Sequence, residues 1–118
     1  GLSYTTFAIT GVQLVDTGPT PTIRATITNR GDRAGADVVQ VYGGVPDSAY
    51  ARPLQRLVGF ARVELAPGTA RTVDIPVAMD SLAIRRDGRW LTEPGRYQLS
   101  VGRHAHDPNA HVIALPVG

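Results

Sequence analysis

Histidine and aspartate residues near the C-terminus have a spacing that could bind a metal. His104, His106 and Asp107 fall within four residues, and His111 follows. A zinc site needs three or four nitrogen, sulfur or oxygen ligands. The Pro-Asn pair after Asp107 is typical of a solvated loop, and no further ligand stands at a recognised spacing. The sequence therefore predicts no metal site and no cofactor site.

Paired carboxylates and activated serines would indicate hydrolytic chemistry. A glycosidase needs two carboxylates at a set separation across a substrate cleft. Asp80 with Asp87, or Glu64 with Glu93, could supply such a pair, but nothing in the pattern brings either pair together. The serines lack a Gly-x-Ser-x-Gly elbow, and the chain has no phosphate-binding Gly-x-x-x-x-Gly-Lys. We assign no catalytic residue to this chain.

Two further features would suit binding rather than catalysis. Residues 30–32 spell the cell-adhesion tripeptide Arg-Gly-Asp, although the same residues suit a turn for backbone reasons. Aromatic side chains could form a platform for sugars, but only where they cluster on the surface. Tyr42 and Tyr97 lie in apolar stretches and are expected in the core or at its rim, and Trp90 is expected to pack inward. Tyr50 remains the one aromatic candidate for an exposed contact.

The composition argues against nucleic-acid and membrane partners. The 118 residues include 12 basic and 10 acidic side chains, all the basic ones Arg, for a net charge of +2. The acidic residues are interleaved with the Arg residues, whereas a nucleic-acid-binding protein concentrates basic charge on one face. No apolar run approaches the roughly 18 residues of a transmembrane helix. The absence of cysteine excludes disulfides and thiolate metal sites.

The N-terminus suggests that the chain is part of a longer polypeptide. It does not begin with Met, and residues 1–7 lack the basic and apolar regions of a signal peptide. We therefore expect residues 1–118 to form one domain excised from a larger protein. No compartment is predicted.

Short strands separated by turns must position all of these residues. Alternating or β-branched apolar residues predict strands at 7–15, 22–28, 37–42, 57–65, 72–77, 97–101 and 111–117. Gly11 disturbs the first alternation and indicates a β-bulge. Pro76 cannot donate a ladder hydrogen bond, which predicts an edge strand. The pattern predicts an all-β fold, a two-sheet antiparallel β-sandwich of about seven strands.

The segments between these strands carry distinct turn signals. The Asp87-Gly88 pair suits a type I′ hairpin turn. Residues 80–84 are expected to form one helical turn or a brief strand. Residues 43–53 form the longest predicted irregular segment, and they include Tyr50.

Five stretches resemble the fibronectin type III-like C-terminal domain of glycoside hydrolase family 3, which holds β-glucosidases and β-xylosidases. They are GLSYTTF at 1–7, NRGDRAGADVVQVY at 29–42, RPLQRLVGFARV at 52–63, LAPG at 65–68, and Trp90 with EPGRY at 93–97. They occur in the order of the family and together span nearly the whole chain. The ordered set is specific, whereas one stretch alone would be weak.

The resemblance implies a fold, a role and a partner. It implies a fibronectin type III- or immunoglobulin-like sandwich without catalysis, because the family's catalytic Asp and Glu belong to upstream domains whose motifs do not occur here. The implied partners are those catalytic domains of the same parent chain, on which the sandwich docks and which it stabilises. The candidate contact residues follow from the length of the irregular segment and from the resemblance: Tyr50, Arg52, Pro53 and Leu54.

Two alternatives stay open from the residues. One is a module that binds carbohydrate or a cell surface. The other is a free-standing structural domain with no glycosidase attached.

Overall fold

The computed structural model describes residues 6–16, 18, 20–46, 48–49, 55–104 and 107–117. Within these ranges the chain forms nine strands and one short 3₁₀-helix. In chain order they are β1 (Phe7–Asp16), β2 (Thr22–Asn29), β3 (Gly35–Gly44), β4 (Arg56–Leu65), β5 (Ala70–Pro76), η1 (Met79–Leu82), β6 (Ile84–Arg86), β7 (Arg89–Leu91), β8 (Gly95–Gly102) and β9 (His111–Val117).

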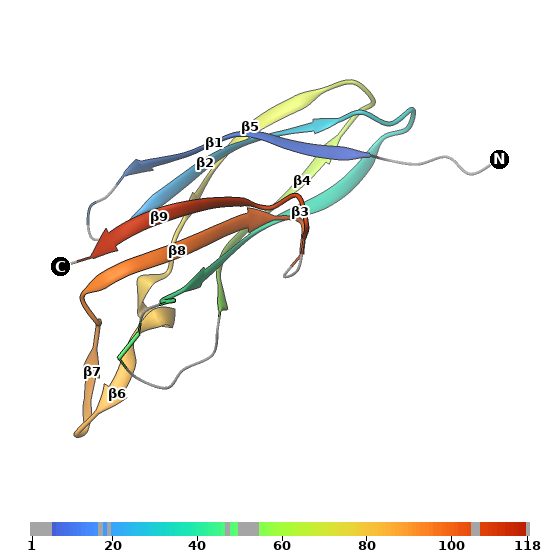
Figure 1. The fold of residues 1–118 in the computed structure, drawn as a ribbon. Helices are drawn as coiled ribbons and strands as arrows, with labels where there is room; N and C mark the ends of the chain where they lie inside the picture. The colour runs from blue at the N-terminus through green and yellow to red at the C-terminus, as the bar shows by residue number, and fades with distance from the viewer. Residues whose placement is uncertain are drawn as a thin grey trace.

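Seven of these strands form two antiparallel sheets that face each other (Figure 1). The first sheet has the order β1-β2-β5, and the second sheet has the order β4-β3-β8-β9. Strands β6 and β7 pair only with each other and extend from one end of the sandwich. The predicted two-sheet antiparallel sandwich is confirmed, and the two additional strands form a separate hairpin.

The core lies between the two sheets, where the alternating residues point inward. Ile23 and Ile27 of β2 and Leu99 and Val101 of β8 belong to one core cluster, and none is more than 1% exposed. Burying one such side chain stabilises the fold by about 1.5–3 kcal/mol. Tyr97 is fully buried, as expected from its place in an apolar strand. The period-two pattern therefore sets which face of each strand is buried.

Local irregularities occur where the sequence predicts them. Gly11 has a φ of 61°, and the β1–β2 register shifts between Thr10 and Gln13, which confirms the bulge. Strand β5 lies at the edge of the first sheet, as predicted, and it ends at Pro76, one residue before the predicted end. Both irregularities leave the inward face of the strands in register with the core.

Strand β3 extends further than the sequence predicts. It continues to Gly44, whereas the irregular segment was expected to begin at Gly43. A Cβ atom at Gly43 would lie 2.9 Å from Leu82 Cδ1 and 3.3 Å from Leu99 Cδ2. A larger residue would have to displace these two leucine side chains, so the glycine marks close packing rather than the start of a loop.

The outer face of the first sheet is polar. Arg24 and Asp74 form an ion pair of 2.8 Å across β2 and β5, and the hydroxyls of Thr26 and Thr72 lie 3.0 Å apart. The hydrogen bonds between the ion-pair partners raise the pKa of Arg24 and lower the pKa of Asp74. This face is typical of a surface that stays in water.

Candidate functional site at the hairpin end of the sandwich

The candidate contact residues Tyr50, Arg52, Pro53 and Leu54 lie outside the described residues, so their role stays a prediction. The chain around them is anchored at one end of the sandwich. Gly43, near the end of β3, pairs with Arg56 at the start of β4. Ala49 is bound by the side chain of Glu93. The segment is therefore attached on both sides to the end of the sandwich where β3 finishes.

Glu93 anchors the chain before this segment through a buried carboxylate. Its side chain is 6% exposed and accepts hydrogen bonds from Ser48 Oγ at 2.6 Å and from Ala49 N at 2.7 Å. Its backbone carbonyl accepts a hydrogen bond of 2.6 Å from the Tyr97 hydroxyl. The sequence did not reveal this role, because the Glu-Pro-Gly triplet carries only a turn signal.

A hairpin arm, residues 84–91, projects from the same end. The predicted tight turn is confirmed, since Asp87 and Gly88 have φ values of 52° and 75°. Ile84 and Leu91 pair at the base of the arm and are half-buried, whereas the six residues between them are exposed. The arm therefore has little contact with the core of the sandwich.

Trp90 does not pack inward, and the expectation that it does is wrong. Its side chain is 68% exposed, because the hairpin that carries it leaves the sandwich instead of folding against it. The guanidinium of Arg85, its cross-strand partner, lies 5.4 Å from the centre of the Trp90 ring. Trp90 also borders a cavity of about 370 Å³ together with Asp80 and Ala83. The arm thus presents an aromatic surface that the sequence did not reveal.

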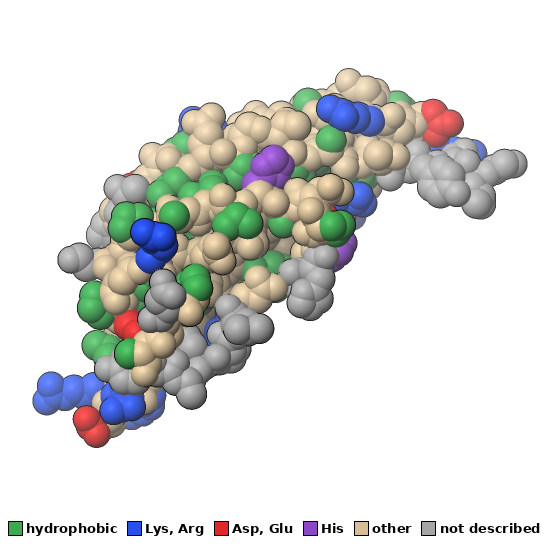
Figure 2. Space-filling model, viewed as in Figure 1, with side chains coloured by type: hydrophobic (Ala, Val, Ile, Leu, Met, Phe, Trp, Pro, Cys, Tyr) green, Lys and Arg blue, Asp and Glu red, His purple; other side chains and the backbone are tan. Residues whose placement is uncertain are grey.

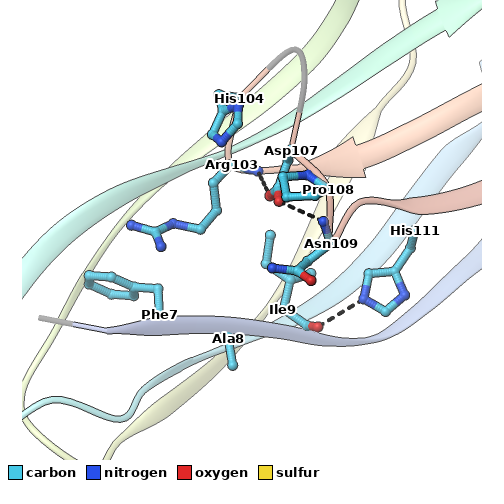
Figure 3. Close-up of a pocket in the computed structure, with 9 residues that line it drawn as sticks. All are labelled: Phe7, Ala8, Ile9, Arg103, His104, Asp107, Pro108, Asn109 and His111. Atoms are coloured by element: carbon cyan, nitrogen blue, oxygen red, sulfur yellow. Dashed lines mark hydrogen bonds between the residues drawn. The ribbon is translucent and has the colours of Figure 1, made fainter.

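The candidate metal residues form a loop held by hydrogen bonds (Figure 3). The carboxylate of Asp107 accepts hydrogen bonds from the backbone N–H groups of Arg103 and Asn109, each at 2.9 Å. The first of these lowers the pKa of Asp107. His111 Nε2 lies 3.0 Å from the carbonyl oxygen of Ile9.

These residues surround a cavity of about 450 Å³ between β1 and the β8–β9 loop. His106 lies outside the described residues. Among the residues that the structure does describe, no group of three or more His, Cys, Asp or Glu could hold a metal ion.

The carboxylate pairs are not arranged as a hydrolytic site. Glu64 pairs with Ala36 near the start of β3 and lies 2.8 Å from Arg62, whereas Glu93 lies past the end of β3. Asp80 belongs to η1, and Asp87 occupies the tip of the arm. Each of these residues has a position set by a strand, a helix or a turn.

The Arg-Gly-Asp tripeptide is part of a turn organised by a buried asparagine. Asn29 is fully buried, and its Oδ1 accepts a hydrogen bond from Gly31 N at 2.9 Å. Its Nδ2 donates to the carbonyls of Arg33 at 2.8 Å and Leu65 at 3.0 Å. The tripeptide therefore lies in a turn, as expected, and binding to a cell surface stays an open alternative. Within the described ranges, no helix has the length and apolar character needed to span a membrane.

Comparison with protein families decides the identity of the fold. A family model described as the fibronectin type III-like domain matches residues 37–105, which include β4, β5, the arm, Glu93 and β8. The chain belongs to the fibronectin type III-like domain family. The family match covers the buried carboxylate and the exposed arm as well as β4, β5, β8 and most of β3.

Relatives of this fibronectin type III-like domain are glycosidases. It is 40% identical over 110 residues to beta-glucosidase B of Emericella nidulans, covering 91% of this chain and 13% of the relative. It is 39% identical over 125 residues to a beta-glucosidase of Rhizobium radiobacter, covering 99% of this chain and 15% of the relative. An exo-alpha-(1->6)-L-arabinopyranosidase of Bifidobacterium breve is 40% identical over 110 residues, with 91% and 14% covered. The domain thus spans about one seventh of the length of these relatives.

Solved structures show the same arrangement of the chain. The GH3 beta-glucosidase of Bifidobacterium adolescentis superposes with a TM-score of 0.84 at 36% identity, covering 98% of this domain and 18% of that chain. DesR, a beta-glucosidase of Streptomyces venezuelae whose structure contains D-glucose, superposes with a TM-score of 0.85 at 31% identity. That match covers 100% of this domain and 16% of the other chain.

Proposed function

We propose that this fibronectin type III-like domain is a non-catalytic accessory domain of a family 3 glycoside hydrolase, and that it docks on and stabilises the catalytic domains of the same polypeptide. One observation carries the proposal. The domain aligns over 91–99% of its own length with glycosidases of which it covers only 13–15%. In such relatives most of the chain lies outside this domain.

The geometry supports an accessory role. The carboxylates considered for hydrolysis lie in a 3₁₀-helix, a hairpin turn, a surface ion pair and a buried hydrogen-bonded anchor instead of flanking one cleft. The buried core spans both sheets, which suits a rigid body attached to a larger enzyme. Interfaces between domains of one chain are modest in area and fairly polar, so a mixed surface is compatible with docking.

The first test is the size of the native polypeptide. An antibody raised against this domain should detect a band several times larger than 12.5 kDa in the source organism, and that band should hydrolyse β-glucosides. A native band near 12.5 kDa would contradict the proposal and leave a domain that works alone.

The second test asks whether the domain stabilises the catalytic region. Deleting residues 1–118 from the long polypeptide should lower its melting temperature and shorten the half-life of its β-glucosidase activity. An unchanged melting temperature would leave the accessory assignment but remove the stabilising role.

Carbohydrate binding is the second candidate function, and the exposure of Trp90 favours it. The exposed Trp90 ring could stack on a sugar, and the carboxylate of Asp80, which lines the same cavity, could accept a hydrogen bond from a sugar hydroxyl. Titrating the domain with β-glucan oligosaccharides while recording Trp90 fluorescence tests this candidate. No change in emission at millimolar oligosaccharide would count against it.

A further inference from the structure

The hairpin arm is largely exposed, and a hairpin of this size is not stable on its own. An isolated two-stranded hairpin is marginally stable in water at best. Each strand of the arm has three residues, and only the Ile84–Leu91 pair at its base is half-buried. The arm extends away from both sheets (Figure 1). A surface that covers the arm would supply the packing that the sandwich does not.

The side chains of the arm have the composition of a binding hot spot. Tryptophan and arginine are the residues that most often carry binding energy at protein interfaces. The arm carries Trp90 with Arg85, Arg86 and Arg89, against one acidic residue, Asp87. Within the described ranges neither Arg85 nor Arg89 lies in a salt bridge. Figure 2 shows these basic side chains gathered at the projecting end of the molecule.

A cavity lies beside Trp90. The ring borders a cavity of about 370 Å³ that Asp80 and Ala83 also line. The arm ends at Leu91, two residues before Glu93, which binds Ala49 ahead of the predicted contact segment. The arm and that segment are therefore attached to the same end of the sandwich.

We propose that the arm is the anchor by which this domain docks, and that its occupant is an acidic surface of the catalytic region in the same polypeptide. This inference rests on the proposed function, which supplies the catalytic region. Among the described residues Arg85 and Arg89 have no carboxylate partner, so an acidic surface opposite them would add charge-assisted hydrogen bonds. The partner surface also needs an apolar recess, because a tryptophan contributes to binding when its ring is desolvated.

The test uses the long polypeptide that contains this domain. One variant combines Trp90→Ala with Arg85→Glu and Arg89→Glu. A matched control combines Phe60→Ala with Arg33→Glu and Arg71→Glu, which removes one exposed aromatic ring and reverses two exposed arginines on the sandwich itself. The rate at which a protease releases the domain is measured for both, at low and high salt.

The arm variant should release the domain about tenfold faster or more, because loss of hot-spot contacts changes binding by at least that factor. The control variant should behave as the unmodified polypeptide. High salt should speed release of the unmodified polypeptide, because it screens the attraction between the arginines and the acidic surface. It should slow release of the arm variant, because it screens the repulsion that the two introduced glutamates cause. Equal release from the arm and control variants would overturn the inference.

Two further measurements keep the outcomes separate. Trp90→Phe with Arg85→Lys and Arg89→Lys keeps aromatic character and charge, so it should recover much of the docking, whereas a misfolded arm would not. Release unchanged in the arm variant, together with oligosaccharide-dependent Trp90 fluorescence of the unmodified isolated domain, would make the arm a sugar-binding element instead. A native polypeptide no longer than this domain would contradict the proposed function. If the polypeptide is long but the arm variant releases the domain at the rate of the control variant, only this inference is contradicted.

Discussion

At the scale of single residues, two buried polar side chains hold the opposite ends of the sandwich. Asn29 is fully buried and binds the carbonyl of Leu65, which pairs with Gly35 at the start of β3. Glu93 is 6% exposed and binds Ala49, beyond the end of β3. Buried polar groups are retained only when their hydrogen bonds are satisfied. Each residue therefore fixes a connecting segment that lies outside the hydrogen-bonded strands.

Glu93→Ala should lower the free energy of unfolding by about 2–3 kcal/mol, because it removes hydrogen bonds from Ser48 and Ala49 to a buried carboxylate. Urea unfolding measures the change, and hydrogen exchange should show faster exchange at Ala49. The control Glu64→Ala removes an exposed ion pair with Arg62 and should cost less than about 1 kcal/mol. Equal effects of the two substitutions would contradict the structural role of Glu93.

The pH dependence of stability should include a contribution from Asp107. Its folded pKa is lowered, mainly by the hydrogen bond from the Arg103 backbone N–H. A lowered folded pKa stabilises the fold above the unfolded pKa of about 3.9, and the contribution is lost as the pH falls through the folded value.

Asp107→Asn should therefore be less stable than the unmodified domain at pH 7, and the difference should shrink below about pH 4. Melting temperatures recorded from pH 7 to pH 2 test this. A constant difference across that range would show that the charge of Asp107 does not contribute.

At the scale of elements, local patterns predicted most strands, and contacts between distant segments decided the rest. Alternation predicted the strands because each has one face in the core. Asp87-Gly88 predicted the hairpin turn because its conformation is local. The direction of Trp90 could not be predicted, since it depends on where the hairpin stands relative to the sheets. Neither could the end of β3, because Gly43 packs closely against Leu82, a residue far along the chain.

The candidate site was harder to predict than the fold for the same reason. The bond between Glu93 and Ala49 joins residues 44 positions apart, and no sequence motif signals it. The sequence predicted an irregular segment at 43–53, of which residues 43 and 44 belong to β3. The buried anchor and the exposed arm became visible when the strands were placed in space.

Gly59→Ala should destabilise the domain by about 1–3 kcal/mol, as expected for a group forced into a packed interior. A Cβ atom there would lie 2.8 Å from both Ile75 Cγ2 and the carbonyl oxygen of Pro76, where β4 crosses β5. Thermal and urea unfolding measure the effect. Phe60→Ala, on the neighbouring and 64% exposed residue, should change stability by no more than about 0.5 kcal/mol. If Gly59→Ala left the free energy of unfolding unchanged, the two sheets would be able to separate locally without loss of stability.

At the scale of the whole molecule, the domain is elongated. Its extents are 57 × 27 × 20 Å, and its radius of gyration is 16.0 Å. A compact domain of this length would have a radius of gyration of about 13.5 Å. The projecting arm contributes to the difference, since it extends the long axis of the sandwich (Figure 1).

Unfolding of the whole domain should be nearly invisible to tryptophan fluorescence. Trp90 is the single tryptophan, and it is already 68% exposed in the folded state. In urea, far-UV circular dichroism should show a cooperative transition, because one core joins the two sheets. The emission maximum should move little over the same range. A large red shift on unfolding would mean that the ring is covered in the folded domain.

The four outer strands of the two sheets have one feature in common. β1 is bulged at Gly11, β4 carries an extra residue at Val58 opposite β3, and β5 and β9 contain Pro76 and Pro116. Bulges and prolines on such strands block pairing with the strands of another molecule. The isolated domain should therefore persist as a dispersed monomer at high concentration instead of assembling into fibrils.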